Sequence, residues 1–228
     1  MRALAVILTA GAFAAGCGGS SSNGVASKSP ADIVKATEQA ATSASAVHVT
    51  GTIVNGDSKL TIDLRFVGTA HATGHISEQG VGFDVVRIGD RVYIRGSKAF
   101  YAKFAGSAAA ALLQGKWLFG SATSGDFSSF EPLTDLGSFF SELLKSHGKL
   151  AKGAETTIDG QKAIGLEDTS ASGGGTLYVA TTGKPYPVEL KSPGGGKEGT
   201  VTFGDWNKKV TVTAPKSALD LKKLESGG

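Results

Sequence analysis

From Val47 onward the sequence alternates apolar and polar residues, and this pattern restricts the fold more than any other feature of the chain. Val47, Val49 and Ile53 alternate with polar residues, and a second alternating run continues to Phe66 after the turn Asn55-Gly56-Asp57. A period of two is typical of a strand with one buried face, and Asn-Gly is typical of a hairpin turn. The pattern therefore predicts an antiparallel sheet with one apolar and one polar face.

Similar short segments follow over most of the chain, separated by glycine-containing turns. They include 98–104 and 209–213, and together they predict a sheet of about eleven strands. Glycine accounts for 33 of the 228 residues. This is roughly twice the usual share of ~7%, as expected for many tight turns between short strands.

Three segments carry helical signals instead. Ser29-Pro30-Ala31-Asp32 has a capping serine, a first-turn proline and an early acid, and it predicts a helix to about Ala46. Residues 107–114 are alanine-rich, and residues 133–147 have one broad apolar face. The strands before and after this last helix look alike and neither set closes a sheet alone, so residues 29–228 are predicted to form a single domain.

The N-terminus has the pattern of an export signal. Arg2 precedes an apolar stretch from Ala3 to Ala15, which is shorter than the ~20 residues that span a bilayer. The stretch ends in Ala14-Ala15-Gly16-Cys17, which resembles the bacterial lipobox. The resemblance implies that residues 1–16 are removed as a lipoprotein signal peptide and that Cys17 carries acyl chains. The alternative is an ordinary signal peptide with an incidental cysteine.

Residues 17–28 contain a Gly/Ser-rich stretch and are predicted to form a flexible tether. Acyl chains on Cys17 would hold the protein in a membrane, because each buried CH₂ contributes about 0.8 kcal/mol. The predicted location is therefore the outer face of the bacterial plasma membrane, in the cell envelope.

Several classes of function are disfavoured by composition and spacing. A net charge of +3 is too small to indicate a nucleic-acid binder, and a single cysteine excludes an internal disulfide or a cysteine-built zinc site. His71 and His75 would lie about 13 Å apart along one strand, too far to chelate one ion. The chain has no Gly-x-Ser-x-Gly elbow and no phosphate-binding loop. We therefore expect no enzyme activity, no catalytic residues, no cofactor and no metal.

The order of elements is a helix, a long meander, a helical insertion and a further meander. Together with Gly89-Asp90-Arg91-Val92-Tyr93-Ile94, Glu131-Pro132-Leu133 and Ile158-Asp159-Gly160, this order resembles the actinobacterial lipoproteins of the LppX/LprA/LprF/LprG type, which have a LolA/LolB-like fold. The resemblance covers nearly all of residues 29–215. It implies an α+β fold in which a large curved antiparallel sheet, a half-barrel, wraps a few helices and leaves an apolar cavity for acyl chains.

The residues expected to line such a cavity come from two strands and from the helix 133–147. They are Leu64, Phe66, Phe83, Val85, Leu136, Phe139, Phe140, Leu143 and Leu144. The alternative for each of them is an ordinary core position. The leading hypothesis is a membrane-anchored lipoprotein that binds and shuttles or presents an acylated lipid, glycolipid or lipoprotein, with an envelope transporter or acceptor protein as a possible partner. The alternative is a structural or protein-interaction lipoprotein with a filled core.

The C-terminal region is basic. It contains Lys208-Lys209, Lys216 and Lys222-Lys223. Such a run is usually a solvated face, but in a tethered protein it can also lie near anionic lipid headgroups.

Overall fold

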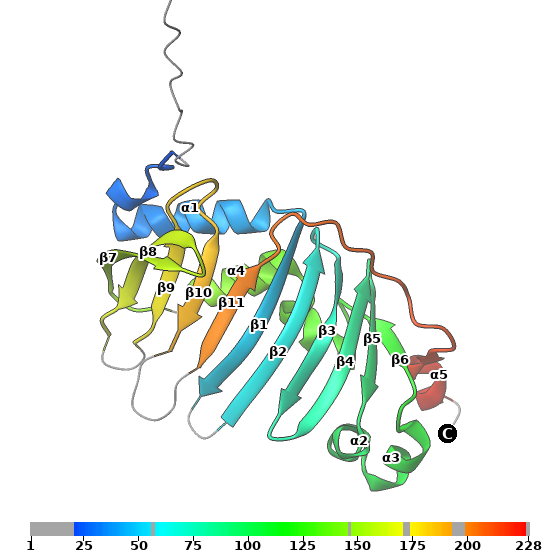
Figure 1. Cartoon of the computed structure of the whole chain (residues 1–228). Helices are drawn as coiled ribbons and strands as arrows, with labels where there is room; N and C mark the ends of the chain where they lie inside the picture. Colours follow the sequence, from blue (N-terminus) through cyan, green and yellow to red (C-terminus); the bar gives the residue numbers. More distant parts are fainter. Residues whose placement is uncertain (1–20, 56–57, 146, 171–173, 193–198, 227–228) are drawn as a thin grey trace, which may run out of the picture.

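The computed structural model of the chain describes residues 21–55, 58–145, 147–170, 174–192 and 199–226. The predicted signal peptide, Cys17 and the Gly56-Asp57 turn lie outside these residues. One sheet of twelve strands dominates the structure, in the order β12-β6-β5-β4-β3-β2-β1-β11-β10-β9-β8-β7 (Figure 1). All neighbouring strands are antiparallel except β12 and β6, which are parallel. The strands are β1 Ala46–Asn55, β2 Ser58–Val67, β3 His71–Glu78, β4 Val81–Ile88, β5 Arg91–Gly96, β6 Leu118–Ser121, β7 Leu150–Ile158, β8 Gln161–Asp168, β9 Thr176–Ala180, β10 Pro187–Lys191, β11 Thr200–Gly204 and β12 Leu219–Asp220.

The register of the strands places the alternating apolar residues on one face. Val49 pairs with Leu64, Leu64 with Gly74, Gly74 with Val85, and Val85 with Ile94. The four side chains in this row are at most 1% exposed. The predicted alternation is therefore confirmed, and we call this apolar side of the sheet the inner face.

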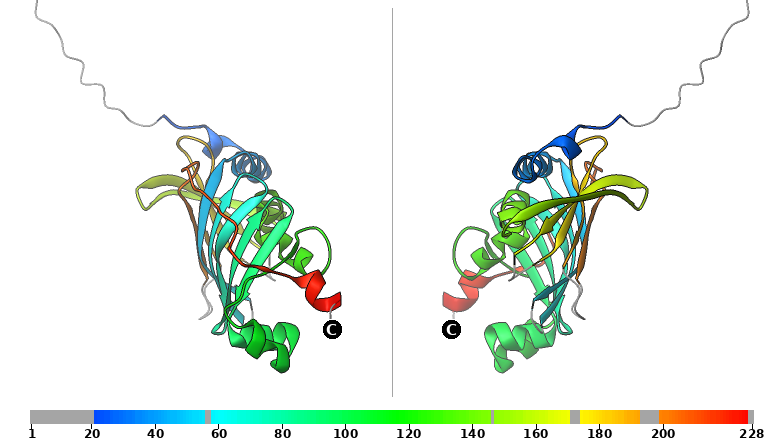
Figure 2. Two further views of the ribbon diagram at one scale, coloured as in Figure 1. Left: turned by 90° about the vertical axis from the view of Figure 1, so that its right-hand side faces the viewer. Right: turned by 90° about the vertical axis from the view of Figure 1, so that its left-hand side faces the viewer.

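Helices cover the inner face and one edge of the sheet. α1 and α4 lie on the inner side and contact each other (Figure 2). α2 and α3 lie together at the strand ends where β5 finishes (Figure 1). No helix among the described residues is long and apolar enough to cross a membrane. The helices are α1 Pro30–Thr42, α2 Lys98–Ala105, α3 Ser107–Leu113, α4 Leu136–Lys145 and α5 Leu221–Ser226, with two 3₁₀ helices, η1 Val25–Ser27 and η2 Asp126–Leu133. The α+β half-barrel predicted from the sequence is confirmed, with twelve strands where about eleven were expected.

Two of the predicted strands are wrong. Residues 98–104 form α2, because the hydroxyl of Ser97 accepts a hydrogen bond from the Phe100 backbone N–H at 3.1 Å and so caps a helix. Residues 209–213 are not part of any strand in the described chain and instead run along an edge of the sheet (Figure 1). The predicted helix 133–147 begins later, at Leu136, because Asp135 caps it through a 2.9 Å bond from the Ser138 N–H.

Residues 21–28 were expected to be tether but pack on the domain. Ser22 forms a β-bridge with Thr182, and the Asn23 backbone N–H donates to the Thr181 carbonyl at 2.9 Å. Val25 is 2% exposed and belongs to the core. Of the predicted tether 17–28, the described residues 21–28 are therefore part of the folded domain.

Candidate functional site

Helix α4 is held on the inner face by aromatic contacts. The ring of Phe139 lies 5.1 Å from that of Phe66 on β2, and Phe140 lies 5.6 Å from Phe203 on β11 and 5.8 Å from Trp206. Rings at these separations pack favourably beyond the area that they bury. The helix is thus seated over the middle of the sheet, where β1, β2 and β11 adjoin.

The structure brings most of the predicted ligand-binding residues together in this place. Leu136 and Phe140 from α4 and Leu64 and Phe66 from β2 are fully buried. Phe139, Leu144 and Val85 are also buried, and Leu143 packs against the same core while remaining partly exposed. These residues now fill the space between α4 and the sheet.

Phe83 packs against the same core but contacts other aromatic rings than those of α4. Its ring lies 4.8 Å from Phe100 on α2 and 5.3 Å from Phe130 on η2, and Phe130 in turn lies 6.0 Å from Phe127. Phe100 was missed because 98–104 has the alternation of a strand. Phe127 and Phe130 were missed because no helix was predicted over 126–133. The serine at position 97, a good helix cap, was the signal that would have identified α2.

An aromatic stack beside Phe140 was also missed from the sequence. Tyr186 and Trp206 stack with ring centroids 4.2 Å apart and planes 4° from parallel. Asn207 donates a 2.8 Å hydrogen bond to the Tyr186 hydroxyl. Because Trp206 also contacts Phe140, the loop before β10 and the turn after β11 are both tied to α4.

Glycines on the inner face make room for the rings of the covering helices. A Cβ on Gly96 would lie 2.2 Å from the Phe100 ring, and a Cβ on Gly120 would lie 2.5 Å from the Phe127 ring. Phe127 is 2% exposed, so its ring has little space into which to move.

Gly120→Ala is expected to lower the free energy of unfolding by about 1–3 kcal/mol, the usual cost of overpacking a core. The matched control is Gly204→Ala, since nothing lies within 4 Å of a Cβ at that position. Chemical denaturation of both variants measures the difference. Equal stabilities would contradict the close packing of Phe127 on β6.

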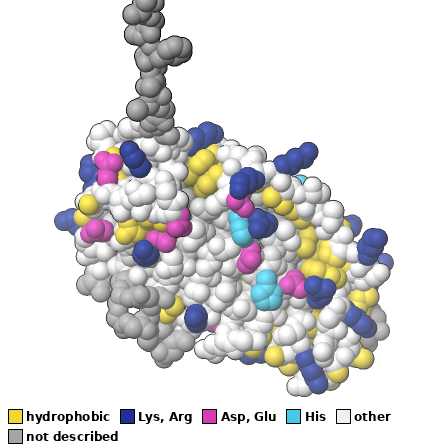
Figure 3. Space-filling model, in the orientation of Figure 1, with side chains coloured by type: hydrophobic (Ala, Val, Ile, Leu, Met, Phe, Trp, Pro, Cys, Tyr) yellow, Lys and Arg dark blue, Asp and Glu magenta, His cyan; other side chains and the backbone are white. Residues whose placement is uncertain are grey.

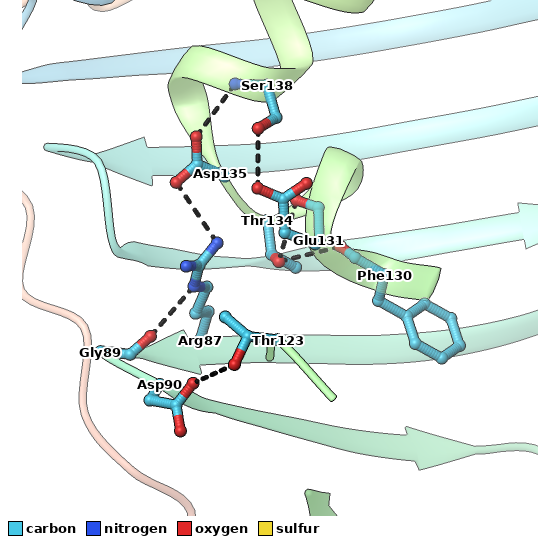
Figure 4. Close-up of polar contacts among 9 residues, drawn as sticks. All are labelled: Arg87, Gly89, Asp90, Thr123, Phe130, Glu131, Thr134, Asp135 and Ser138. Carbon is cyan, nitrogen blue, oxygen red and sulfur yellow. Dashed lines mark hydrogen bonds and ion pairs between the residues drawn. The ribbon is translucent and has the colours of Figure 1, made fainter. Parts of the chain in front are cut away.

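One ion pair fixes the beginning of α4 to the sheet. Arg87 on β4 points to the inner face, and its Nη1 lies 3.4 Å from Oδ2 of Asp135, with the two side chains 8% and 18% exposed (Figure 4). The Arg87 Nε–H also donates to the Gly89 carbonyl at 3.0 Å. Since Asp135 caps α4 as well, the same carboxylate joins the helix to β4.

Further hydrogen bonds tie η2 to α4. The Ser138 hydroxyl of α4 donates to the Glu131 carboxylate of η2 at 2.7 Å, and the Thr134 hydroxyl, between the two helices, donates to the Phe130 carbonyl of η2 at 2.9 Å (Figure 4). The two helices therefore form one hydrogen-bonded unit with the Arg87 contact at its centre.

Two surface hollows lie away from α4. One, of about 520 Å³, is lined by β8–β11 residues that include Tyr178 and Lys191. The pKa of the Lys191 amine is raised by its contact with Glu189, 3.0 Å away. The lining of this hollow is largely polar, as expected of a solvated surface and not of a site for an acyl chain.

The other hollow, of about 580 Å³, is lined by residues that include His75, Asp84 and Arg95. Burial alone would raise the pKa of Asp84, but hydrogen bonds from His75 and Arg95 outweigh it and lower that pKa. The carboxylate is thus held in its charged form by hydrogen bonds from His75 and from the Arg95 guanidinium, which matches an ordinary surface charge cluster.

Comparison with known proteins identifies the fold. No protein-family profile and no curated protein matches the chain. Among solved structures, the chain resembles LprF from Mycobacterium bovis, with 13% sequence identity and a TM-score of 0.54 over 82% of this chain and 96% of that one. The lipoprotein LppX from Mycobacterium tuberculosis matches 82% of this chain and 100% of its own, with 20% identity and a TM-score of 0.49. The likeness to LprF confirms the fold expected from the sequence resemblance.

Proposed function

We propose that this protein is an envelope lipoprotein that is anchored through Cys17 and binds an acylated lipid, glycolipid or lipoprotein between α4 and the inner face of the sheet, in order to shuttle or present it. The observation that carries this proposal is the wide apolar inner face, which extends across the curved sheet and is covered mainly by short helices (Figure 2). The likeness in fold to LprF, whose type the sequence resembles, supports it.

The ligand would take the place that the aromatic and leucine side chains of α4 now occupy. Phe139 packs on Phe66 across this interface, and Leu144 lies five residues further along α4. Burial of each CH₂ contributes about 0.8 kcal/mol, so ten buried CH₂ groups contribute about 8 kcal/mol toward displacing these contacts. Arg87 and Asp135 would keep the first turn of α4 in position while the rest of the helix adjusts.

The proposed role is binding without catalysis. The charged groups at this interface, Arg87 and Asp135, are committed to each other. The described residues include no group of three or more His, Cys, Asp or Glu side chains that could hold a metal ion. The side chains that face a ligand here offer apolar contact, which suits a fatty-acyl chain.

Leu144→Trp is expected to abolish co-purification of acyl lipid with the mature protein and to change the thermal midpoint little, because the larger ring would occupy the space of the acyl chain. Leu144 is 5% exposed. Lipid extraction followed by mass spectrometry measures the cargo, and calorimetry measures the midpoint. Leu112→Trp on α3 is the matched control, since Leu112 is 70% exposed, and it should keep both the cargo and the midpoint of the unaltered protein.

A lipoprotein with a filled core is the second candidate, and the near-complete burial of Leu136, Phe140 and Leu144 favours it. In that case the unaltered protein carries no lipid. Leu144→Trp and Leu136→Trp would then both lower the midpoint strongly, since overpacking a filled core costs about 1–3 kcal/mol. This pair of results would contradict the carrier function.

A further inference from the structure

The C-terminal segment 206–224, which we call the strap, is strongly basic. It contains five lysines and one acidic residue, Asp220, and it is flanked by Glu225 and by Asp205, which forms a 2.7 Å ion pair with Lys208. All five lysines are exposed, and Leu224 is 44% exposed at its end. The lysines are Lys208, Lys209, Lys216, Lys222 and Lys223.

The strap begins at the row of strand ends and turns where β1 starts and β2 and β4 finish. We call this row the edge, as distinct from an edge strand. The Asn207 backbone N–H donates to the Ala46 carbonyl at 2.8 Å, so the strap starts where β1 begins and β11 ends. From there it runs past the β2–β3 and β4–β5 turns to β12 and α5 (Figure 1). Figure 3 shows Lys and Arg side chains distributed along this edge, with hydrophobic side chains between them.

The N-terminal segment reaches the domain at the same edge. Ser22 bridges Thr182 in the turn between β9 and β10. β9 and β11 run in the same direction, because each is antiparallel to β10, and so both end at the edge where the strap starts. The chain therefore enters the domain and begins its basic strap on one side of the molecule.

Chain length limits how far this edge can lie from an anchor at Cys17. Three residues lie between Cys17 and Ser21, the first described residue, so four residue-to-residue steps join the two. At about 3.6 Å per extended residue they span at most ~14 Å. A lipid anchor at Cys17 would thus hold this edge next to the membrane surface and leave the domain little freedom to turn away.

We propose that the strap binds the anionic headgroups of the membrane that carries the lipid anchor, so that the edge bearing the β2–β3 and β4–β5 turns faces the bilayer. This inference rests on the proposed anchor at Cys17. Lysines near an anionic surface attract it over about a Debye length, and an exposed leucine adds apolar contact with the headgroup region. A basic segment supplies a second membrane signal beside the acyl chains.

The opposite ends of the same strands provide a matched control. Lys59 lies at the beginning of β2, Lys98 at the beginning of α2, and Lys103 near the end of α2. All three are exposed, and they lie at the far ends of the strands from the strap's first residues (Figure 1). Replacing three lysines at either end of the strands changes the net charge of the protein equally.

The test uses the mature chain, residues 17–228, with Cys17→Ser so that no acyl chain is attached. Removal of residues 1–16 deletes none of the described elements. Co-sedimentation with vesicles of phosphatidylcholine and phosphatidylglycerol, and with vesicles of phosphatidylcholine alone, measures binding at low and high salt. We expect binding only to the mixed vesicles, and binding that salt weakens.

The combined variant Lys209→Gln, Lys216→Gln, Lys222→Gln is expected to bind on the order of fivefold more weakly for each lysine removed, or roughly a hundredfold in total. The variant Lys59→Gln, Lys98→Gln, Lys103→Gln should bind nearly as well as the unaltered chain. Equal losses in the two variants, or no preference for the anionic vesicles, would overturn the proposal. If the unaltered protein carried no lipid but still bound the anionic vesicles, this result would count against the proposed carrier function and would leave this inference intact.

Discussion

Arg87→Met is expected to destabilise the protein by about 3 kcal/mol, at the lower end of the cost of breaking a buried ion pair. The substitution keeps much of the side-chain volume but leaves the Asp135 carboxylate, which is 18% exposed, without its cationic partner. It also leaves the Gly89 carbonyl without the Arg87 donor. The lower end applies because Asp135 keeps its bond to the Ser138 N–H. For a domain of about 200 residues, the thermal midpoint should fall by about 6–12 °C.

The same substitution at an exposed ion pair is the control. Arg95 holds Asp84 through two hydrogen bonds, at 3.0 and 2.8 Å, but its side chain is 46% exposed and that of Asp84 is 32% exposed. Arg95 also lies over the ring of Trp117. Arg95→Met should cost only about 1 kcal/mol, because solvent screens the pair. If calorimetry gave equal shifts for Arg87→Met and Arg95→Met, burial would not be what makes the Arg87 contact important.

Cys17→Ala is expected to move the protein from the membrane fraction to the soluble envelope fraction or the medium. The thiol of Cys17 is the site at which the lipobox-like sequence Ala14-Ala15-Gly16-Cys17 would be acylated. Two or three acyl chains hold a protein stably in a bilayer, whereas a protein without them has only surface attraction.

Immunoblotting of fractions, before and after a high-salt wash, measures this effect. The wash matters because the strap is expected to give weak, salt-sensitive binding even without an acyl chain. Ser20→Ala leaves the sequence around the cysteine intact and should stay in the membrane fraction. A Cys17→Ala protein that resists the high-salt wash as well as the unaltered protein does would show that the anchor assignment is wrong.

The strands were predictable because a strand with one buried face is a local pattern. The alternation that ends in Leu64 and Phe66 places both residues on the inner face whatever they contact there. The apolar face of α4 was equally visible, since Leu136, Phe139 and Phe140 recur at helical spacing. Periodicity reports which side of an element is buried, and so most of the candidate site could be named in advance.

Predictions failed where a short segment fits two patterns. In residues 98–104, Phe100 and Phe104 satisfy an alternating pattern and a helical one, and the Ser97 cap decides in favour of the helix. In residues 209–213, valines alternate with polar residues, but the segment joins no strand ladder among the described residues and becomes part of the strap. A pattern predicts how a segment would pair, and only the sheet around it determines whether a partner exists.

The sequence by itself determined the local features of this protein: the alternating strands, the apolar face of α4, the basic C-terminal segment and the cysteine after a small-residue stretch. The tertiary structure decided the contacts between distant residues. Arg87 meets Asp135 across 48 positions, and Asn23, in a segment whose composition indicated a tether, bonds to Ala180 across 157. Period and composition describe neighbours along the chain, whereas such pairs form only when packing of the sheet brings the two segments together.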